Sequence, residues 1–193
     1  MKKLLRIFPP LILLLLICAC GQKPSVSAPE ATVLATVNGE ALTQTEVDYF
    51  TKRSRSDIIN QYAEAYGITD FSNFWATEYG GTTPTQALRE LAFSQAVQAK
   101  IELLLLKQNG IYEDISFQAL HDKAVEYNQT HQNKTAVGLT EIDLDNFYTY
   151  YLETGKMELK NRLGDGYDQA VLNAQNSAIV QKADGTQTDC SKP

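Results

Sequence analysis

Cysteine is scarce in this sequence, which has only three, Cys18, Cys20 and Cys190, in 193 residues. Cys18 and Cys20 lie at the end of an N-terminal apolar segment that we expect to be processed. Only Cys190 would then remain as a free thiol, so an intramolecular disulfide is excluded.

The sequence also lacks the common catalytic motifs. It contains no Gly-rich phosphate loop, no HExxH and no GxSxG. The only two histidines, His121 and His131, are ten positions apart, a spacing that does not bring both to one metal or one active centre within a helix. We expect both on the surface, and we expect no enzyme activity, no cofactor and no metal.

Basic residues are outnumbered by acidic ones in this sequence. The chain has 17 Lys and Arg against 23 Asp and Glu, and loss of Lys2, Lys3 and Arg6 with the N-terminal segment would take the net charge from −6 to −9. Nucleic acid is therefore an unfavourable partner. After the first twenty residues, no apolar run approaches the roughly 20 residues that a spanning helix needs.

The N-terminus carries a recognisable export signal. Three basic residues precede an apolar run over residues 9–17, which is too short for a membrane span and is typical of a signal peptide. The end of the run resembles the lipobox of bacterial prolipoproteins: Ile17, Cys18, Ala19, Cys20. We expect a signal peptide over residues 1–19, lipidation of Cys20 and a lipid anchor in the cell membrane on its extracytoplasmic face. The alternative is an ordinary signal peptide.

Residues 20–32 are predicted to form the lipidated N-terminus and a flexible tether, because residues 22–30 include two prolines and two serines and have no periodicity. Extended, these nine residues would reach about 30 Å. We expect the folded domain over residues 33–183 and a disordered tail over residues 184–193.

The folded part begins with a β-rich run, residues 33–37, that ends at an Asn-Gly turn signal. A helix is expected to follow directly, since Thr43 and Glu46 have the spacing of a capping box. It runs to Gly67. An aromatic loop follows, and Thr83, Pro84 and Gln86 predict the start of a second, Leu-rich helix that stops at residues 109–110.

Three further segments are predicted. A third helix begins at Ser116 and frays over residues 128–135, a fourth runs from Thr140 to Leu163, and residues 167–180 form a short helix or a strand. The fold class is therefore mainly α, with a short N-terminal β segment followed by a bundle of four to five helices.

A resemblance to a known family adds to this. The stretch ATVNGEALTQTEVDYF (residues 35–50) and the Leu-rich helix ending in NGI (residues 109–111) resemble the N-terminal chaperone domain shared by the periplasmic chaperone SurA and the Gram-positive foldase lipoprotein PrsA. The resemblance covers residues 33–163, and residues 74–111 resemble lipoproteins of the Firmicutes. It implies a SurA N-terminal-like fold that binds unfolded or exported polypeptides as a holdase.

In this family, full-length members commonly carry a parvulin-type peptidyl-prolyl isomerase domain of roughly a hundred residues between the helical bundle and a final returning segment. Here Tyr167 follows Leu163 almost at once, which leaves no room for that domain. Residues 167–180 resemble the segment that returns after it. One alternative is a protein that belongs to the prolyl isomerase family but lacks the catalytic domain. Another is a lipoprotein that assembles with one dedicated partner.

A chaperone of this kind needs adaptable apolar and aromatic side chains on its surface. Aromatics at helical spacing, such as Tyr148 and Tyr151, are more often part of a core, whereas the loop aromatics Phe74, Trp75 and Tyr79 are as typical of a surface as of a core. The candidate peptide-binding residues are Phe71, Phe74, Trp75, Tyr79, Tyr148 and Tyr151.

Overall fold

The computed structural model describes residues 32–131 and 141–189, and this part of the chain is mainly helical, as predicted. The predicted signal peptide, Cys20, all of the predicted tether except Thr32, and Cys190 lie outside the described residues. The elements in chain order are β1 (Val33–Val37), β2 (Glu40–Thr43), α1 (Gln44–Tyr66), a 3-10 turn (Phe74–Ala76), α2 (Pro84–Gln108), α3 (Phe117–His131), α4 (Leu144–Leu163), a second 3-10 turn (Gly164–Gly166), α5 (Tyr167–Ser177), β3 (Ile179–Lys182) and β4 (Gln187–Asp189).

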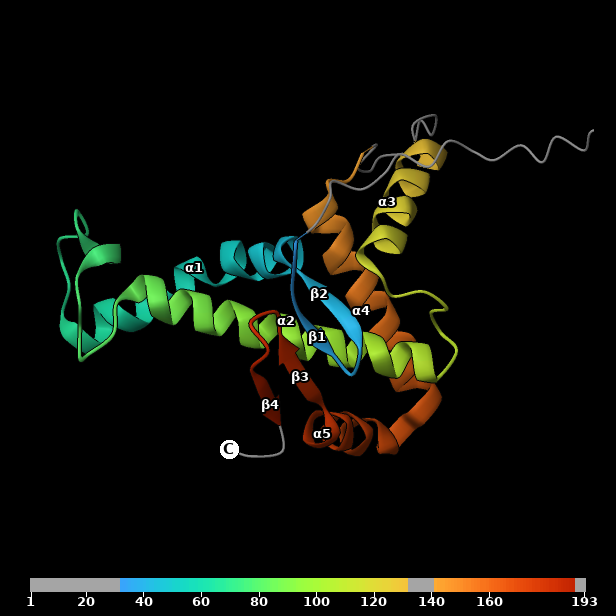
Figure 1. The fold of residues 1–193 in the computed structure, drawn as a ribbon. Helices are drawn as coiled ribbons and strands as arrows, with labels where there is room; N and C mark the ends of the chain where they lie inside the picture. Colours follow the sequence, from blue (N-terminus) through green and yellow to red (C-terminus); the bar gives the residue numbers. More distant parts are fainter. Residues whose placement is uncertain (1–31, 132–140, 190–193) are drawn as a thin grey trace, which may run out of the picture.

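The helices α1 and α2 form a long hairpin whose far half projects from the rest of the molecule (Figure 1). We call residues 55–94 the arm and residues 66–83 its tip. The arm has a small core of its own, made of four buried side chains: Ile58, Tyr62, Phe74 and Leu88.

Both long helices start at the capping boxes that the sequence predicts. The Thr43 amide donates to Glu46 Oε2 at 2.8 Å, and the Glu46 amide donates back to the Thr43 hydroxyl at 3.3 Å. Thr83 and Gln86 make the same exchange, with Pro84 in the first turn. These reciprocal bonds satisfy amides that no helical carbonyl can reach.

The sheet is larger than predicted, because the C-terminal part of the chain returns to it. Its order is β2-β1-β3-β4, and each neighbouring pair is antiparallel. The Asn38-Gly39 turn is confirmed, with φ of 48° and 86°, but residues 40–43 form strand β2 before the helix begins. The segment 167–180 contains both a helix and the start of a strand.

The prediction of a disordered tail from residue 184 is wrong for residues 187–189. These residues form β4, which pairs with β3 through Ile179–Asp189, Val180–Thr188 and Gln181–Gln187. An exposed strand edge offers a row of unpaired backbone groups, and this short hairpin satisfies them on β3.

Helix α4 packs over the C-terminal half of α2, and α3 packs on α4, around the largest buried cluster of the described residues. The helix α4 begins at Leu144 rather than at Thr140, because Asp143 caps it by accepting from the Asn146 amide at 2.7 Å. Residues 128–131 are helical rather than frayed. The Asn128 side chain holds this end, exchanging two hydrogen bonds of 2.9 Å with the backbone of Ile142.

Both histidines are half-buried and so lie only partly at the surface. The ring of His131 stacks on Tyr127 with centroids 3.9 Å apart. Within residues 32–131 and 141–189, no three His, Cys, Asp or Glu side chains gather in a way that could hold a metal ion.

Three tyrosines, Tyr112, Tyr148 and Tyr151, make the stability of the protein sensitive to alkaline pH. Burial raises the pKa of Tyr112 to about 12 and raises the pKa of Tyr148 and of Tyr151 above the ordinary value of 10. Each group therefore contributes stability that is complete below pH 10 and is lost as pH rises toward its folded-state pKa. We expect the free energy of unfolding to fall above pH 10, by up to about 1.4 kcal/mol per pH unit for each tyrosine that ionises only in the unfolded chain.

Urea unfolding at several values between pH 9 and about pH 12 measures this slope. Tyr112→Phe should reduce the slope, because it removes one of the three tyrosines whose pKa is raised by burial. Phe71→Leu, at an exposed ring that carries no ionisable group, is the control and should leave the slope unchanged. Equal slopes for all three proteins would contradict the prediction.

Candidate functional site

The tip of the arm presents aromatic side chains to solvent. Phe71 is 43% exposed and Tyr66 is 50% exposed, while Trp75 and Tyr79 are half-buried. The Arg55 guanidinium lies 4.3 Å from the centre of the Trp75 ring, a cation–π contact. The tip is thus an ordered surface with an aromatic face.

The tip is held in place by backbone contacts. The Thr85 hydroxyl donates to the Trp75 carbonyl at 2.7 Å, which ties the loop to the first turn of α2. Tyr79 and Thr82 bond to each other's backbone across the turn at 3.0 and 3.3 Å. These bonds fix the aromatic side chains relative to the two helices.

Phe74 was predicted to be part of the binding surface, but it is buried. Its side chain is 1% exposed and contacts the ring of Tyr62 edge-on at 6.1 Å. It forms the core of the tip and cannot reach a partner in this conformation. The 3-10 turn over Phe74–Ala76 turns this ring inward between the two helices.

Tyr148 and Tyr151 are a second correction. They are 3% and 5% exposed, because both point from α4 into the main core. Tyr148 meets Tyr49 edge-on at 4.7 Å, and Tyr151 stacks on Tyr112 at 4.1 Å. Only Phe71, Trp75 and Tyr79 of the six predicted residues therefore share one accessible surface.

A groove that the sequence analysis missed lies at the base of the arm, beside the sheet. It has a volume of about 680 Å³, within the roughly 300–1,000 Å³ that is typical of ligand pockets. Apolar side chains from three elements line it, and both signs of charge stand around them. The lining residues are Leu34, Gln44, Val47, Asp48, Thr51, Arg89, Glu90, Phe93 and Lys182.

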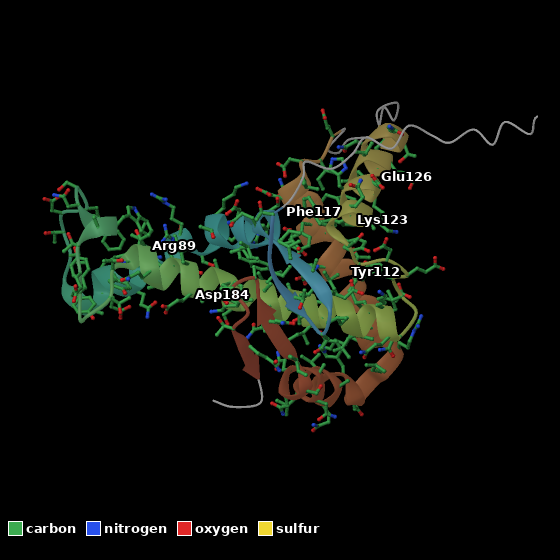
Figure 2. All side chains as sticks on the ribbon, in the orientation of Figure 1. Arg89, Tyr112, Phe117, Lys123, Glu126 and Asp184 are labelled. Carbon is green, nitrogen blue, oxygen red and sulfur yellow. The ribbon has the colours of Figure 1, made fainter. Side chains whose placement is uncertain are left out.

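The groove depends on contacts between distant parts of the chain. Figure 2 labels Arg89 on the part of α2 that belongs to the arm and Asp184 in the turn that follows β3. Lys182, at the end of β3, lies 5.4 Å from the ring centre of Phe93 on α2. Leu34 lies at an irregularity in the pairing of β1 with β2, a feature that changes where side chains point. Neither the contact between Lys182 and Phe93 nor the irregularity at Leu34 has a local signal in the sequence.

A second depression is polar and faces α4, on another side of α1. It consists of two adjoining parts of about 230 and 450 Å³ that share Phe50, Arg53 and Gln95. We call it the polar cleft. Its lining comes from α1, α2 and α4, which meet here through side chains.

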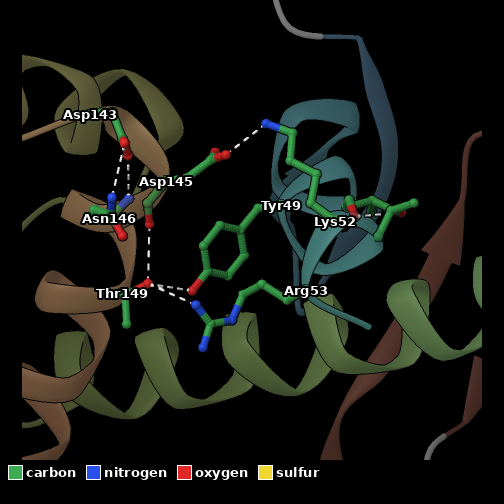
Figure 3. Close-up of polar contacts among 9 residues, drawn as sticks. Tyr49, Lys52, Arg53, Asp143, Asp145, Asn146 and Thr149 are labelled. Atoms are coloured by element: carbon green, nitrogen blue, oxygen red, sulfur yellow. Dashed lines mark hydrogen bonds and ion pairs between the residues drawn. The ribbon is translucent and has the colours of Figure 1, made fainter. Parts of the chain in front are cut away.

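Figure 3 shows the bonds that join α1 to α4 beside this cleft. Lys52 pairs with Asp145 at 2.6 Å, and the hydrogen bond and charge of that carboxylate raise the pKa of Lys52. The Thr149 hydroxyl donates to the Asp145 carbonyl at 3.1 Å, so it accepts from the Tyr49 hydroxyl at 2.6 Å. Arg53 Nη1 also lies 3.5 Å from this oxygen.

Comparison with known proteins finds no matching family model, no matching curated protein and no matching solved structure. Within the described part of the chain, every helix is too short or too polar to cross a bilayer. The candidate surfaces are therefore the tip, the groove and the polar cleft, judged on their own chemistry.

Proposed function

We propose that this chain is a membrane-anchored extracytoplasmic lipoprotein that binds unfolded or exported polypeptides as a holdase. The observation that carries the proposal is the open groove at the base of the arm, with Leu34, Val47 and Phe93 among its lining. The signal-peptide and lipobox pattern supports the location. Two or three acyl chains on Cys20 would anchor the protein more firmly than the marginal binding of a single chain.

The chemistry of the groove suits clients of many sequences. Burial of apolar surface is favourable by about 25 cal/mol per Å² and has no directional requirement, so any apolar side chain of a client gains by entering. The surrounding charges have both signs, with Asp48 and Glu90 against Arg89 and Lys182. A client segment of either charge therefore finds a partner.

The tip offers a second contact for the same client. Phe71 and Trp75 belong to the tip, which is the far end of the hairpin in Figure 1, whereas the groove is lined by residues at the base of the arm. Two weak contacts on one rigid hairpin act together, because the first binding event raises the effective concentration of the client at the second.

Aggregation of a denatured model protein tests the proposal. We expect the chain from residue 20 onward, with Cys20→Ser to prevent acylation, to suppress light scattering at a near-equimolar ratio. Phe93→Ala should weaken suppression on the order of tenfold and Phe71→Ala by less, since truncating an aromatic anchor typically costs more than about 1 kcal/mol of binding. Tyr150→Ala removes a ring of similar exposure outside both surfaces and should have no effect.

Suppression that is absent over a wide excess of the protein would contradict holdase activity. A single stoichiometric partner recovered from membranes would then favour the lipoprotein that assembles with one dedicated partner. Turnover of a proline peptide would instead favour a peptidyl-prolyl isomerase, for which we expect no activity.

A further inference from the structure

We propose that the polar cleft binds the main chain of an extended polypeptide, with Arg53 and Gln95 donating hydrogen bonds to its carbonyl oxygens. This inference deepens the proposed function and rests on it. The groove would then hold apolar side chains, while the polar cleft would hold the backbone that every client shares.

The first support is a fixed donor on α2. The Ser54 hydroxyl, on a side chain that is 1% exposed, donates to Gln95 Oε1 at 2.6 Å. This bond turns the Gln95 oxygen toward α1 and leaves its amide nitrogen, with two N–H donors, in the lining of the cleft. Such an amide is oriented before any ligand arrives, so little side-chain entropy is lost on binding.

The second support is Arg53, a cation that lines the cleft and is not paired with any carboxylate of the described residues. Among the described residues, Arg53 contacts the Thr149 hydroxyl at 3.5 Å and the Tyr49 ring at 5.4 Å, and it makes no ion pair. The neighbouring Lys52 is held by Asp145. The guanidinium carries five N–H donors, and the contact with Thr149 uses one of them.

The charges around these donors decide which acceptor they suit. Lys156 reaches Glu102 at 2.7 Å and Glu153 at 3.5 Å, and Asp57 lines the outer part of the cleft. Together with Arg53, these side chains give the lining a net charge of −1. A free carboxylate would be repelled by the three acids, whereas a neutral carbonyl oxygen would not.

A peptide main chain meets these conditions. It offers carbonyl acceptors at regular spacing without a net charge, and its N–H groups can donate to the exposed carboxylates of Asp57 and Glu153. The aromatic ring of Phe50 lines both parts of the cleft and gives the chain an apolar face to lie on.

The test uses a peptide that is nearly all backbone. A ten-residue Gly-Ser repeat with acetylated and amidated ends has no charge and no large side chain. In a nitrogen–proton NMR spectrum, we expect it to shift the side-chain signals of Gln95 and Arg53 at millimolar concentration. Arg53→Met combined with Gln95→Leu should abolish binding to the cleft, whereas Arg55→Met, at the arginine two positions along α1, should leave it intact.

The outcomes separate this inference from the proposed function. Shifts that persist in Phe93→Ala and vanish in the cleft variant support backbone binding. No shift at Gln95 or Arg53 at tens of millimolar peptide overturns the inference, and so does a larger shift of Arg53 with sodium acetate at the same concentration. If the cleft variant still suppresses aggregation fully while Phe93→Ala does not, the holdase function stands and the role of the cleft fails.

Discussion

Lys100→Met is expected to lower the free energy of unfolding by about 3–5 kcal/mol. Lys100 Nζ lies 2.6 Å from Glu46 Oε1, and the two side chains are only 1% and 2% exposed. Removing the lysine leaves a carboxylate buried without its counter-charge. That carboxylate also caps α1, since it accepts from the Thr43 amide and hydroxyl.

Urea unfolding of three variants checks this prediction. Glu46→Gln combined with Lys100→Met should recover much of the loss, because the amide oxygen of glutamine can still cap α1 without carrying a charge. Lys107→Met breaks the more exposed pair with Glu40 and should cost much less than Lys100→Met, because solvent screens that pair. Equal losses of stability for Lys100→Met and Lys107→Met would show that the buried pair is not electrostatically important.

Gly155→Ala should also destabilise the protein, by about 1–3 kcal/mol, although alanine normally favours a helix. Gly155 lies in α4 against the C-terminal end of α2. A Cβ there would lie 2.6 Å from Leu106 Cδ1 and 2.9 Å from both Cε2 and the hydroxyl of Tyr112. Tyr112 cannot easily move aside, because its hydroxyl donates to the Tyr151 carbonyl at 2.8 Å.

Gly166→Ala is the matched control for this second variant. Gly166 precedes α5, and a Cβ there would meet nothing within 4 Å. Its thermal midpoint should stay near that of the parent protein while that of Gly155→Ala falls. Equal midpoints for the two variants would mean that Leu106 and Tyr112 repack at no cost.

The helix starts were predictable because their signals are local. Thr43 with Glu46, and Thr83 with Gln86, satisfy amides within a single turn, so the pattern of side chains along the chain is sufficient. The fourth helix was predicted to begin at Thr140, but α4 begins at Leu144, because the nearby Asp143 caps it. The strand β4 was missed, because residues 187–189 become a strand only through pairing with β3.

The binding surface was predictable only in part. Aromatic residues in the loop, such as Phe71, stayed accessible, whereas Tyr148 and Tyr151 are spaced along a helix and point into the core. The groove could not be predicted, because it requires Phe93 and Lys182 to meet across the fold. Lys100 stands in an apolar stretch of α2, and its burial follows from a partner on another helix.

The return of the chain to the central strand has a consequence for the timing of folding. The Asn38 side chain accepts from the Ile179 amide across a separation of 141 residues, so one edge of β1 stays unpaired until the C-terminal segment has been synthesised. Such long-range pairing is slow, and an open edge can pair with other chains in the meantime. Because Lys182 on β3 lines the groove, that surface is complete only after the last strands have docked. A nascent or truncated copy would therefore lack the Lys182 side of the groove.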